Sequence, residues 1–383
     1  MPQANMAKPL RPLAMVMVMV MAMLSMAACA IPAGAATALK SAASCQASQA
    51  SGTDADPAPL LYAARPEALQ WADDLAARRD LERQWLRQII GQARFLPSVQ
   101  RLMQPPPAAD RASKNWHLYR SRFITPARIR AGLRFWQAQR SALARAEREY
   151  GVPAEIIVGI IGVETLYGQQ QGRWRVLDAL ATLAFDFPAA HPRAQERTEF
   201  FRRELEQFLS LAQRSGMAPT EPCGSYAGAM GLGQFMPSSW VRYAVDFDGN
   251  GRIDLFNDPA DAIGSVAHYL RGHGWTPGMA THFGVHFDTA RLQLAPLLAP
   301  DILPTFSAAE MQAQGAMPDA AGAQHAGPLA LVELQNGGAA PSYIAGTENF
   351  YAITRYNRSS YYALAVIELG RAVAMARAAQ ATR

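Results

Sequence analysis

Pro153-Ala-Glu-Ile-Ile-Val-Gly-Ile-Ile-Gly-Val-Glu164 is the stretch from which the fold of this chain is best predicted. Proline at its start and Gly168 beyond its end predict a helix. Ile156 and Ile160 precede Glu164 at helical spacing, so this carboxylate is expected on the apolar face. Burial there is costly without a partner or a purpose, and it raises the pKa as a general acid requires. The alternative is a structural glutamate that pairs with an arginine or caps a turn.

The glycine-rich run from Gly224 to Pro237 is the second informative stretch. Glycine allows the backbone to approach a ligand closely, and Ser225 and Gln234 supply neutral hydrogen-bonding groups suited to hydroxyl and N-acetyl groups. A turn-rich segment without a ligand is the alternative. The two stretches together favour a sugar-binding site served by one acidic residue.

Gly162-Val-Glu-Thr165 and Tyr226-Ala-Gly-Ala-Met-Gly-Leu-Gly-Gln-Phe-Met-Pro-Ser-Ser239 resemble the membrane-bound lytic murein transglycosylase B family. The resemblance covers residues 115–275 and resumes at Asn349-Phe-Tyr-Ala-Ile-Thr-Arg-Tyr-Asn-Arg-Ser-Ser-Tyr-Tyr362. It implies a mainly α (α+β) fold, in which a lysozyme-like core is flanked by a helical N-terminal domain and a small β subdomain. It also implies cleavage of the MurNAc–GlcNAc β-1,4 bond of peptidoglycan without water, which gives 1,6-anhydro-MurNAc ends.

The resemblance also assigns roles to individual residues. Glu164 falls on the single catalytic acid and base, while the substrate's N-acetyl group replaces the second carboxylate of ordinary glycosidases. Arg197 falls on an arginine of the family's substrate groove. The family has a second arginine beside it, but this chain has Glu196 at that position, next to residues 189–195, which resemble an insertion. Arg193 is the candidate substitute for this second arginine. The other implied sugar-binding residues are Tyr119, Ser225, Gln234, Tyr269, Tyr356, Asn357 and Tyr362. No cofactor is expected for catalysis.

Asp246-Phe-Asp-Gly-Asn-Gly-Arg-Ile253 matches the first eight positions of an EF-hand loop. Asn257 stands at position 12, where the standard loop has glutamate. The family lengthens this loop to 246–261, which makes Asp261 the expected closing carboxylate. A structural Ca²⁺ is expected, and its ligands would be Asp246, Asp248, Asn250, Arg252 and Asp261. A solvated turn, with Asp258 and Asp261 at the start of the next helix, is the alternative.

The N-terminus predicts export. Lys8 and Arg11 precede an apolar run that ends at Ala27-Ala28-Cys29, so residues 1–28 resemble a signal peptide. Cys29 is the expected lipidation site, and Ala30 after it favours the outer membrane, with residues 29–58 as a flexible tether into the periplasm. Ordinary cleavage near Ala33-Gly34-Ala35 is the alternative.

The remaining composition narrows the function further. The formal charge is +5, and without Lys8 and Arg11 it is 5 − 2 = +3. This modest positive charge suits contact with an anionic wall polymer. The sequence contains no basic block, so it does not support a nucleic-acid-binding function. Cys45 and Cys223 form either a disulfide or two free thiols. His282 and His286 lack a third ligand and an HExxH motif, so no catalytic metal site is expected.

We expect a catalytic region over 59–280, a small β subdomain over 281–348 and a segment over 349–383 that returns to the groove. Expected helices cover 126–150, 153–167, 197–214 and 259–272, with a final helix from Ser360. Expected strands cover 329–334 and 343–353, and the glycine-rich residues 224–258 are expected to be irregular. Expected partners are peptidoglycan glycan strands, a membrane through the lipid, and proteins of wall synthesis or the divisome. Rival functions are a hydrolytic muramidase and a non-catalytic peptidoglycan-binding protein.

Overall fold

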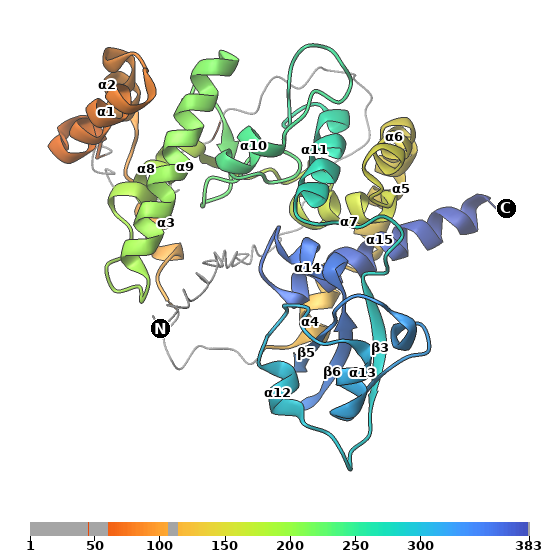
Figure 1. Cartoon of the computed structure of the whole chain (residues 1–383). Helices are drawn as coiled ribbons and strands as arrows, with labels where there is room; N and C mark the ends of the chain where they lie inside the picture. The colour runs from red at the N-terminus through yellow and green to blue at the C-terminus, as the bar shows by residue number, and fades with distance from the viewer. Residues whose placement is uncertain (1–44, 46–59, 106–113, 382–383) are drawn as a thin grey trace, which may run out of the picture.

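The computed structural model describes Cys45, residues 60–105 and residues 114–381. The predicted signal peptide, Cys29 and most of the predicted tether lie outside these residues. Among the described helices, none is long and apolar enough to cross a bilayer. Figure 1 shows a large helical part and, below it, a smaller part that contains most of the strands.

The first helices have their ends fixed by local sequence. Glu82 caps α2, because its carboxylate accepts hydrogen bonds from the backbone N–H groups of Gln84 and Trp85. Asn115 caps α4 in the same way through Leu118 N–H. These elements are η1 (Tyr62–Ala64), α1 (Pro66–Arg79), α2 (Arg83–Gln92), α3 (Pro97–Leu102) and α4 (Trp116–Ser121).

The helical core surrounds a helix that is buried along nearly its whole length. This helix, α7 (Ala154–Thr165), packs along α15 (Ser360–Ala381). Gly159 lies against the backbone of Val366, and Gly370 lies against the backbone of Glu155, so a Cβ at either glycine would collide with main-chain atoms. The close approach of the two helices therefore requires glycine at both positions.

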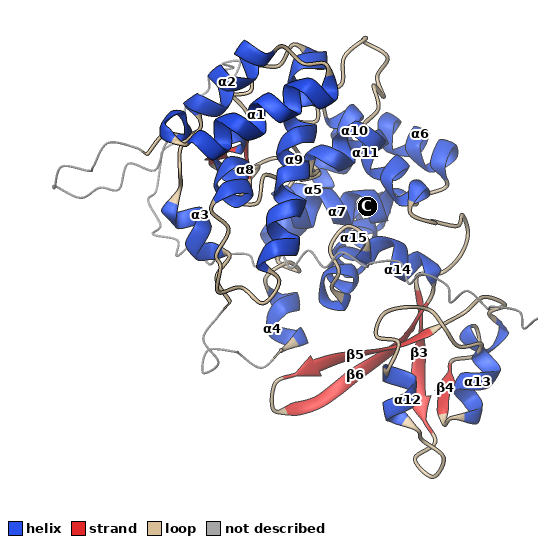
Figure 2. Cartoon of the chain, turned by 60° about the vertical axis from the view of Figure 1, so that its left-hand side comes forward, coloured by secondary structure: helices blue, strands red, loops and turns tan. Residues whose placement is uncertain are grey.

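Further helices and one short strand pair complete the helical part. They are α5 (Pro126–Ala138), α6 (Arg140–Tyr150), α8 (Val176–Phe185), α9 (Ala194–Ser215), α10 (Pro237–Tyr243), α11 (Pro259–Gly272), β1 (Trp174–Arg175) and β2 (Cys223–Gly224). The strands β1 and β2 pair antiparallel and lead into the glycine-rich loop. Helices α8 and α9 pack on each other (Figure 2), and Val176 and Leu180 of α8 lie against Gly224 and Gly228 of the loop.

The small β part is a four-stranded antiparallel sheet with the order β4-β3-β6-β5. Its strands are β3 (His282–Phe287), β4 (Ala316–Pro318), β5 (Ala330–Asn336) and β6 (Ala339–Gly346), accompanied by α12 (Leu294–Leu298), α13 (Ala308–Ala313) and η3 (Gly322–Gln324). It has its own apolar cluster, which includes Leu297, Met311 and Leu331. The chain then returns to the helices through α14 (Glu348–Thr354) and α15. The predicted mainly helical fold with a small β subdomain is confirmed.

Three local predictions were wrong. The single helix predicted over 126–150 is broken at Gln139, because α5 packs on α15 and α7 whereas α6 packs mainly on α11. The strand predicted over 343–353 ends at Gly346, where the Thr347 hydroxyl accepts from Asn349 N–H and caps α14. The supposedly irregular run 224–258 contains α10. In each case packing or a side-chain cap overrides the pattern of apolar residues.

Candidate active site

Glu164 lies near the end of α7, where the chain reverses through two residues of left-handed conformation, Leu166 and Tyr167. Its side chain is buried, with 8% of the residue exposed. Burial raises the pKa of this carboxyl to about 7, while a hydrogen bond from Tyr362 acts in the opposite direction. The Tyr362 hydroxyl donates to Glu164 Oε1 at 2.6 Å. Glu164 is thus a buried carboxyl with a proton that can be exchanged near neutral pH.

The glycine-rich loop is fixed directly to the end of α7. The Thr165 hydroxyl donates to the carbonyl of Leu232 at 2.8 Å and accepts from Gly168 N–H at 3.0 Å. Within the loop, Met230 N–H donates to Phe235 O and Phe235 N–H donates to Met230 O, both at 2.9 Å. Glu164 and the loop therefore share one rigid support.

Gln234 has a backbone conformation that is unusual for a residue other than glycine, because its φ angle is +49°. Its side-chain amide donates to Gln171 O at 3.1 Å and to Gly231 O at 3.0 Å. Among the described residues, the side-chain oxygen of Gln234 receives no hydrogen bond. A fixed amide with an oxygen left to accept is suited to a sugar hydroxyl or N-acetyl N–H group.

Ser225 is held at the start of the same loop. Its hydroxyl oxygen accepts from the N–H groups of Ala227 at 3.3 Å and Ala229 at 3.0 Å. The serine is buried at 8% exposure. These two contacts fix the position of the oxygen and leave the hydroxyl proton as a donor.

Three tyrosines, from α11, from the turn after α14 and from α15, cluster beside Glu164. Tyr356 donates to Gly233 O at 2.6 Å, and its ring lies 4.7 Å from that of Tyr269. Tyr269 donates to Arg355 O at 2.7 Å. Burial raises the pKa of Tyr269, Tyr356 and Tyr362, and the negative charge of Glu164 adds to this effect. All three phenols therefore stay neutral donors when Glu164 ionises.

Tyr119 reaches this cluster from α4. Burial and the charge of Glu164 raise its pKa to about 12. Its ring packs on Phe123 at 5.1 Å and edge-on against Tyr361 at 5.8 Å. The N-terminal helices and the C-terminal segment thus meet at one aromatic wall near Glu164.

The other two expected sugar-binding residues, Arg197 and Asn357, come from α9 and from the turn that follows Tyr356. Arg197 lies on α9, 8% exposed, with its guanidinium over Phe200 and Phe201 at 5.2 and 5.0 Å. Asn357 lies in the turn between α14 and α15, where its carbonyl accepts from Ser359 N–H at 2.7 Å. Arg193, the candidate substitute for the second groove arginine, forms an ion pair with Glu196.

Sequence reasoning missed Gln171 and Arg128. Gln171 accepts from the Gln234 side chain and donates its own side-chain N–H to Phe256 O at 2.9 Å. Arg128 of α5 donates to Gly162 O in the last turn of α7. No local pattern indicated either residue, because Gln171 acts on Gln234 through its backbone carbonyl and Arg128 contacts a helix that is distant in sequence.

The predicted calcium loop brings three carboxylates together. Oxygens of Asp246, Asp248 and Asp261 lie within 4.8 Å of one another. Asp261 is fully buried and accepts from Phe247 N–H at 2.7 Å and Asp254 N–H at 2.8 Å. Burial raises its pKa, and the neighbouring acids Asp258 and Asp248 add to this. An all-oxygen donor set with three acids fits Ca²⁺.

The other expected ligands occupy the rim of this loop. Asn250 donates through its side-chain N–H to Asp248 at 2.8 Å and accepts through its side-chain oxygen from Arg252 N–H at 2.8 Å. Asp258 caps α11 through Ala260 N–H at 2.7 Å. The predicted calcium loop is linked to the glycine-rich loop, because Leu232 N–H donates to Leu255 O at 2.8 Å.

The structure joins Cys45 to Cys223 by a disulfide, with a Cα–Cα distance of 5.5 Å. Cys223 belongs to β2 and directly precedes Gly224 and Ser225. His282 belongs to β3, and burial lowers its pKa to about 4. Within the described residues, the only cluster of potential metal-binding acids, histidines and cysteines is the one at Asp246, Asp248 and Asp261.

Known proteins resemble this chain over most of its length. The model of the Transglycosylase SLT domain family matches residues 64–371. Membrane-bound lytic murein transglycosylase B of Escherichia coli (strain K12) is 43% identical over 324 residues, which cover 82% of this chain and 85% of that protein.

Solved structures agree with this match. The Escherichia coli lytic transglycosylase Slt35 in complex with calcium has a TM-score of 0.72 at 43% identity and covers 83% of this chain and 95% of its own. SltB3 from Pseudomonas aeruginosa in complex with NAG-anhNAM-pentapeptide has a TM-score of 0.64 at 29% identity, with coverages of 79% and 78%. The resemblance inferred from the motifs around Glu164 is confirmed, and the chain belongs to the Transglycosylase SLT domain family of lytic transglycosylases.

Proposed function

We propose that this protein cleaves the MurNAc–GlcNAc β-1,4 bond of peptidoglycan without water and leaves 1,6-anhydro-MurNAc ends. The observation that carries the proposal is the state of Glu164. This carboxyl is buried, has a pKa of about 7 and contacts a neutral phenol next to a rigid loop of sugar-compatible donors and acceptors. Family membership supports the same reaction.

The environment of Glu164 favours single-acid chemistry. Burial and the Tyr362 hydrogen bond account for its shifted pKa, and no other carboxylate of the described chain contributes. Ordinary glycosidases place a second carboxyl roughly 5–10 Å away as nucleophile or base. The N-acetyl group of MurNAc supplies the missing nucleophile in the reaction proposed here.

The proposed steps conserve the proton on the enzyme. Protonated Glu164 gives its proton to the glycosidic oxygen as that bond breaks, while the N-acetyl oxygen of MurNAc attacks the anomeric carbon. The Glu164 carboxylate, stabilised by the Tyr362 hydroxyl, then takes the proton of the C6 hydroxyl. The C6 oxygen closes on the anomeric carbon and displaces the N-acetyl oxygen.

The surrounding residues hold the sugars for this closure. Gln234 and Ser225 present fixed polar atoms, while Tyr119, Tyr269, Tyr356 and Tyr362 form an aromatic wall that keeps water away from the anomeric carbon. Arg197 and Asn357 would contact the strand farther from the scissile bond. A glycan strand is therefore the expected ligand of the whole groove.

The decisive experiment is digestion of purified sacculi followed by mass spectrometry of the products. Ends lighter by one water than reducing MurNAc are expected from the wild-type protein. Reducing ends would instead assign a hydrolytic muramidase, and undigested sacculi would assign a non-catalytic binding protein.

We also propose that Asp246, Asp248, Asn250, the Arg252 carbonyl and Asp261 bind a structural Ca²⁺. The clustered carboxylates support this, as does a relative solved in complex with calcium. Calcium would not take part in the reaction; it would offset repulsion among the acids and hold Leu255 against the active-site loop.

We further propose that Cys29 carries a lipid that anchors the enzyme to the periplasmic face of the outer membrane. The Ala27-Ala28-Cys29 sequence and the membrane-bound relative support this. Fractionation of cells that express the wild type and Cys29→Ala, with intact mass of the mature protein, provides the test. An unmodified wild-type protein that begins near Ala35 would refute the anchor and leave the enzymatic proposal intact. Proteins of wall synthesis or the divisome are proposed partners on the basis of the reaction alone.

A further inference from the structure

Residues 254–257, within the predicted calcium loop, contact two parts of the active site at once. We call them the bridging segment. The carbonyl of Leu255 accepts from Leu232 N–H of the glycine-rich loop at 2.8 Å. The next carbonyl, of Phe256, accepts from the side-chain N–H of Gln171, which follows α7, at 2.9 Å. Two consecutive carbonyls therefore hold two stretches of chain that are far apart in sequence.

Gln234 is held by the same two stretches. Its side-chain N–H group donates to Gln171 O at 3.1 Å and to Gly231 O at 3.0 Å. Its backbone has a φ angle of +49°, a conformation that persists in a residue with a side chain only where the surroundings enforce it. The orientation of the Gln234 amide therefore depends on the positions of Gln171 and Gly231.

The bridging segment is also fixed to the acidic part of the calcium loop. Asp254 N–H donates to Asp261 Oδ2 at 2.8 Å, and Asp261 Oδ1 accepts from Phe247 N–H at 2.7 Å. Asp254 in turn accepts from Phe256 N–H at 2.9 Å, which closes the segment into a tight turn. A single fully buried carboxylate, that of Asp261, thus helps to position the bridging segment.

Asp261 also belongs to the proposed cation site. Its oxygens and those of Asp246 and Asp248 lie within 4.8 Å of one another, and carboxylates this close repel each other when no cation lies between them. A displacement of Asp261 would reach the glycine-rich loop, because the contact there is tight: a Cβ on Gly231 would come within 2.4 Å of Leu255 O. The state of the cation site is therefore expected to affect the glycine-rich loop.

The side chain of Gln171 is the part of this connection that a substitution can remove. Its N–H group donates to Phe256 O, whereas its Oε1 has no hydrogen-bond partner among the described residues. The contact with Gln234 uses the backbone carbonyl of Gln171 instead. A change of side chain thus removes the bond to the bridging segment and keeps the carbonyl that holds Gln234.

We propose that Gln171 is a positioning residue that couples the calcium loop to the glycan groove, so that a cation bound at the loop raises the affinity of the groove for N-acetylated glycan. Such coupling is reciprocal, so bound glycan must raise the affinity for the cation by the same factor. This inference rests on the proposed function, because it takes glycan as the ligand of Gln234. It gives the cation site an effect on substrate affinity in addition to stability.

Calorimetric titration of the mature protein with the peptide-free disaccharide GlcNAc–1,6-anhydro-MurNAc, in calcium and in EDTA, tests the inference. This disaccharide contains no MurNAc–GlcNAc bond, so the measurement does not depend on turnover. Wild-type protein should bind it at least about fivefold more tightly in saturating calcium, a coupling at the lower end of the usual range. Saturating disaccharide should raise the affinity for calcium by the same factor.

Gln171→Met removes the side-chain N–H group and keeps a side chain of similar length. It should reduce the effect of calcium on disaccharide affinity to less than about twofold, and leave the affinity for calcium alone within about twofold of wild type. Gln171→Glu, which keeps the shape but has no N–H group to donate, should act in the same way. Gln170→Met, at the exposed neighbouring glutamine, is the matched control and should keep the full effect.

Hydrogen exchange of the wild-type protein measures the connection without any sugar. Calcium should slow exchange in peptides that contain Leu232, whose N–H group donates to the bridging segment. A merely structural role of Gln171 would weaken disaccharide binding equally in calcium and in EDTA. That result, no effect of calcium on disaccharide affinity or on exchange at Leu232 in the wild type, undetectable disaccharide binding in calcium, or a full calcium effect in Gln171→Met would overturn the inference.

Failure here is separable from failure of the proposed function. If wild-type protein converts sacculi to anhydro ends but binds the disaccharide equally in calcium and in EDTA, only the coupling through Gln171 is wrong. If sacculi yield no anhydro ends, the proposed function is wrong whatever the titrations show.

Discussion

Two regions of the molecule bury a carboxylate, and they surround it with opposite chemistry. Glu164 receives one hydrogen bond from a neutral phenol and has no acidic neighbour that shifts its pKa. Asp261 accepts hydrogen bonds from two backbone N–H groups and lies beside Asp246 and Asp248. A buried carboxyl with few hydrogen-bond donors and no cation among the described groups that shift its pKa tends to keep its proton. Clustered carboxylates favour a site that binds a metal ion. The comparison shows that burial alone does not determine the role of an acid.

The largest effect on activity should come from removing the proton that Glu164 transfers. Glu164→Gln keeps the shape of the side chain but cannot give or take a proton, so release of anhydro products from sacculi should fall by about 10³-fold. The matched control is Glu204→Gln: Glu204 is also buried, but it accepts from Ser238 N–H and its hydroxyl, outside the Glu164 cluster. It should keep most of the activity. Turnover of Glu164→Gln within tenfold of wild type would contradict the assignment.

The same variant should be more stable than wild type at alkaline pH. Folding raises the pKa of Glu164 from 4.5 to about 7, so the native state favours the neutral form and loses stability as pH rises from about 4.5 to 7. Glu164→Gln removes this loss and should raise the free energy of unfolding by about 3 kcal/mol at pH 8, relative to its effect at pH 4. Denaturant unfolding at both pH values measures it. An effect independent of pH would mean that Glu164 is not held in its neutral form.

Calcium should stabilise the other region. At about one hundred times its dissociation constant, a cation that binds only the native state adds about 2.7 kcal/mol, a rise in melting temperature on the order of 5 °C. Asp246→Ala should abolish the rise, because this carboxylate belongs to the proposed ligand set. Thermal scans in calcium and in EDTA provide the test. Identical scans for the wild type, or a rise that persists in the variant, would refute the site.

The smallest effect should come from removing the phenol. Tyr362→Phe deletes a hydrogen bond that favours ionised Glu164, so the pKa of the carboxyl should rise above about 7. Because the acid must start protonated, the alkaline limb of the pH–rate profile should move to higher pH. The maximal rate should fall by about tenfold, since the carboxylate formed during the reaction is less stabilised. An unshifted alkaline limb would show that Tyr362 does not set the acidity of Glu164.

Much of the site could be predicted because its determinants are local. The spacing of Ile156, Ile160 and Glu164 placed the carboxylate on a buried face, and the helix expected from residue 126 does begin at Pro126. The residues that tune the site lie far away in sequence, and Tyr362 is separated from Glu164 by 198 residues. Its position was supplied by family resemblance, because a pattern of apolar residues contains no information about such pairing.

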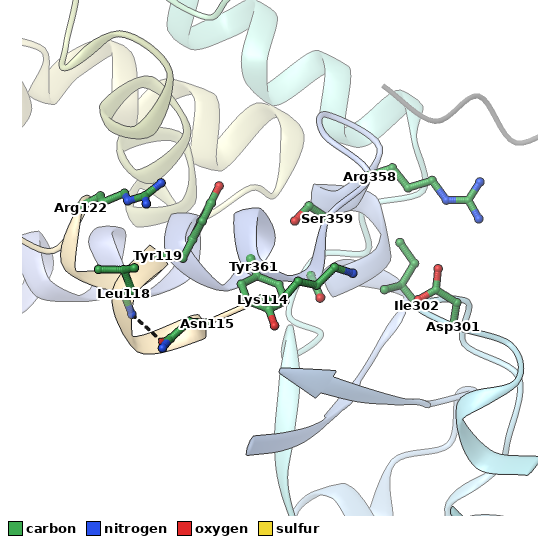
Figure 3. Close-up of a pocket in the computed structure, with 11 residues that line it drawn as sticks. Lys114, Asn115, Leu118, Tyr119, Arg122, Asp301, Ile302, Arg358, Ser359 and Tyr361 are labelled. Carbon is green, nitrogen blue, oxygen red and sulfur yellow. Dashed lines mark hydrogen bonds between the residues drawn. The ribbon is translucent and has the colours of Figure 1, made fainter. Parts of the chain in front are cut away.

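Other features could not be predicted for a different reason. The break at Gln139 involves neither glycine nor proline and arises from separate packing partners for α5 and α6. Gln171 acts through its backbone carbonyl on Gln234, a role that any residue type could fill. The cleft drawn in Figure 3, which includes Lys114, Asp301 and Arg358, joins three segments that are distant in sequence, so its charge appears only after folding.

If Cys29 carries the proposed lipid, the Cys45–Cys223 disulfide would set how far the enzyme can reach from the membrane. From a lipid on Cys29 to Cys45 there are 45 − 29 = 16 residues, whereas Leu60, where the continuous description begins, is 60 − 29 = 31 residues away. A fully extended chain spans roughly 3.5 Å per residue, so the tether from Cys29 would be at most about 56 Å long with the disulfide and about 110 Å long without it. The bond also moves the point of attachment from the first helices to β2, next to Ser225. An oxidising compartment would thereby halve the length of the tether and attach it next to the glycine-rich loop.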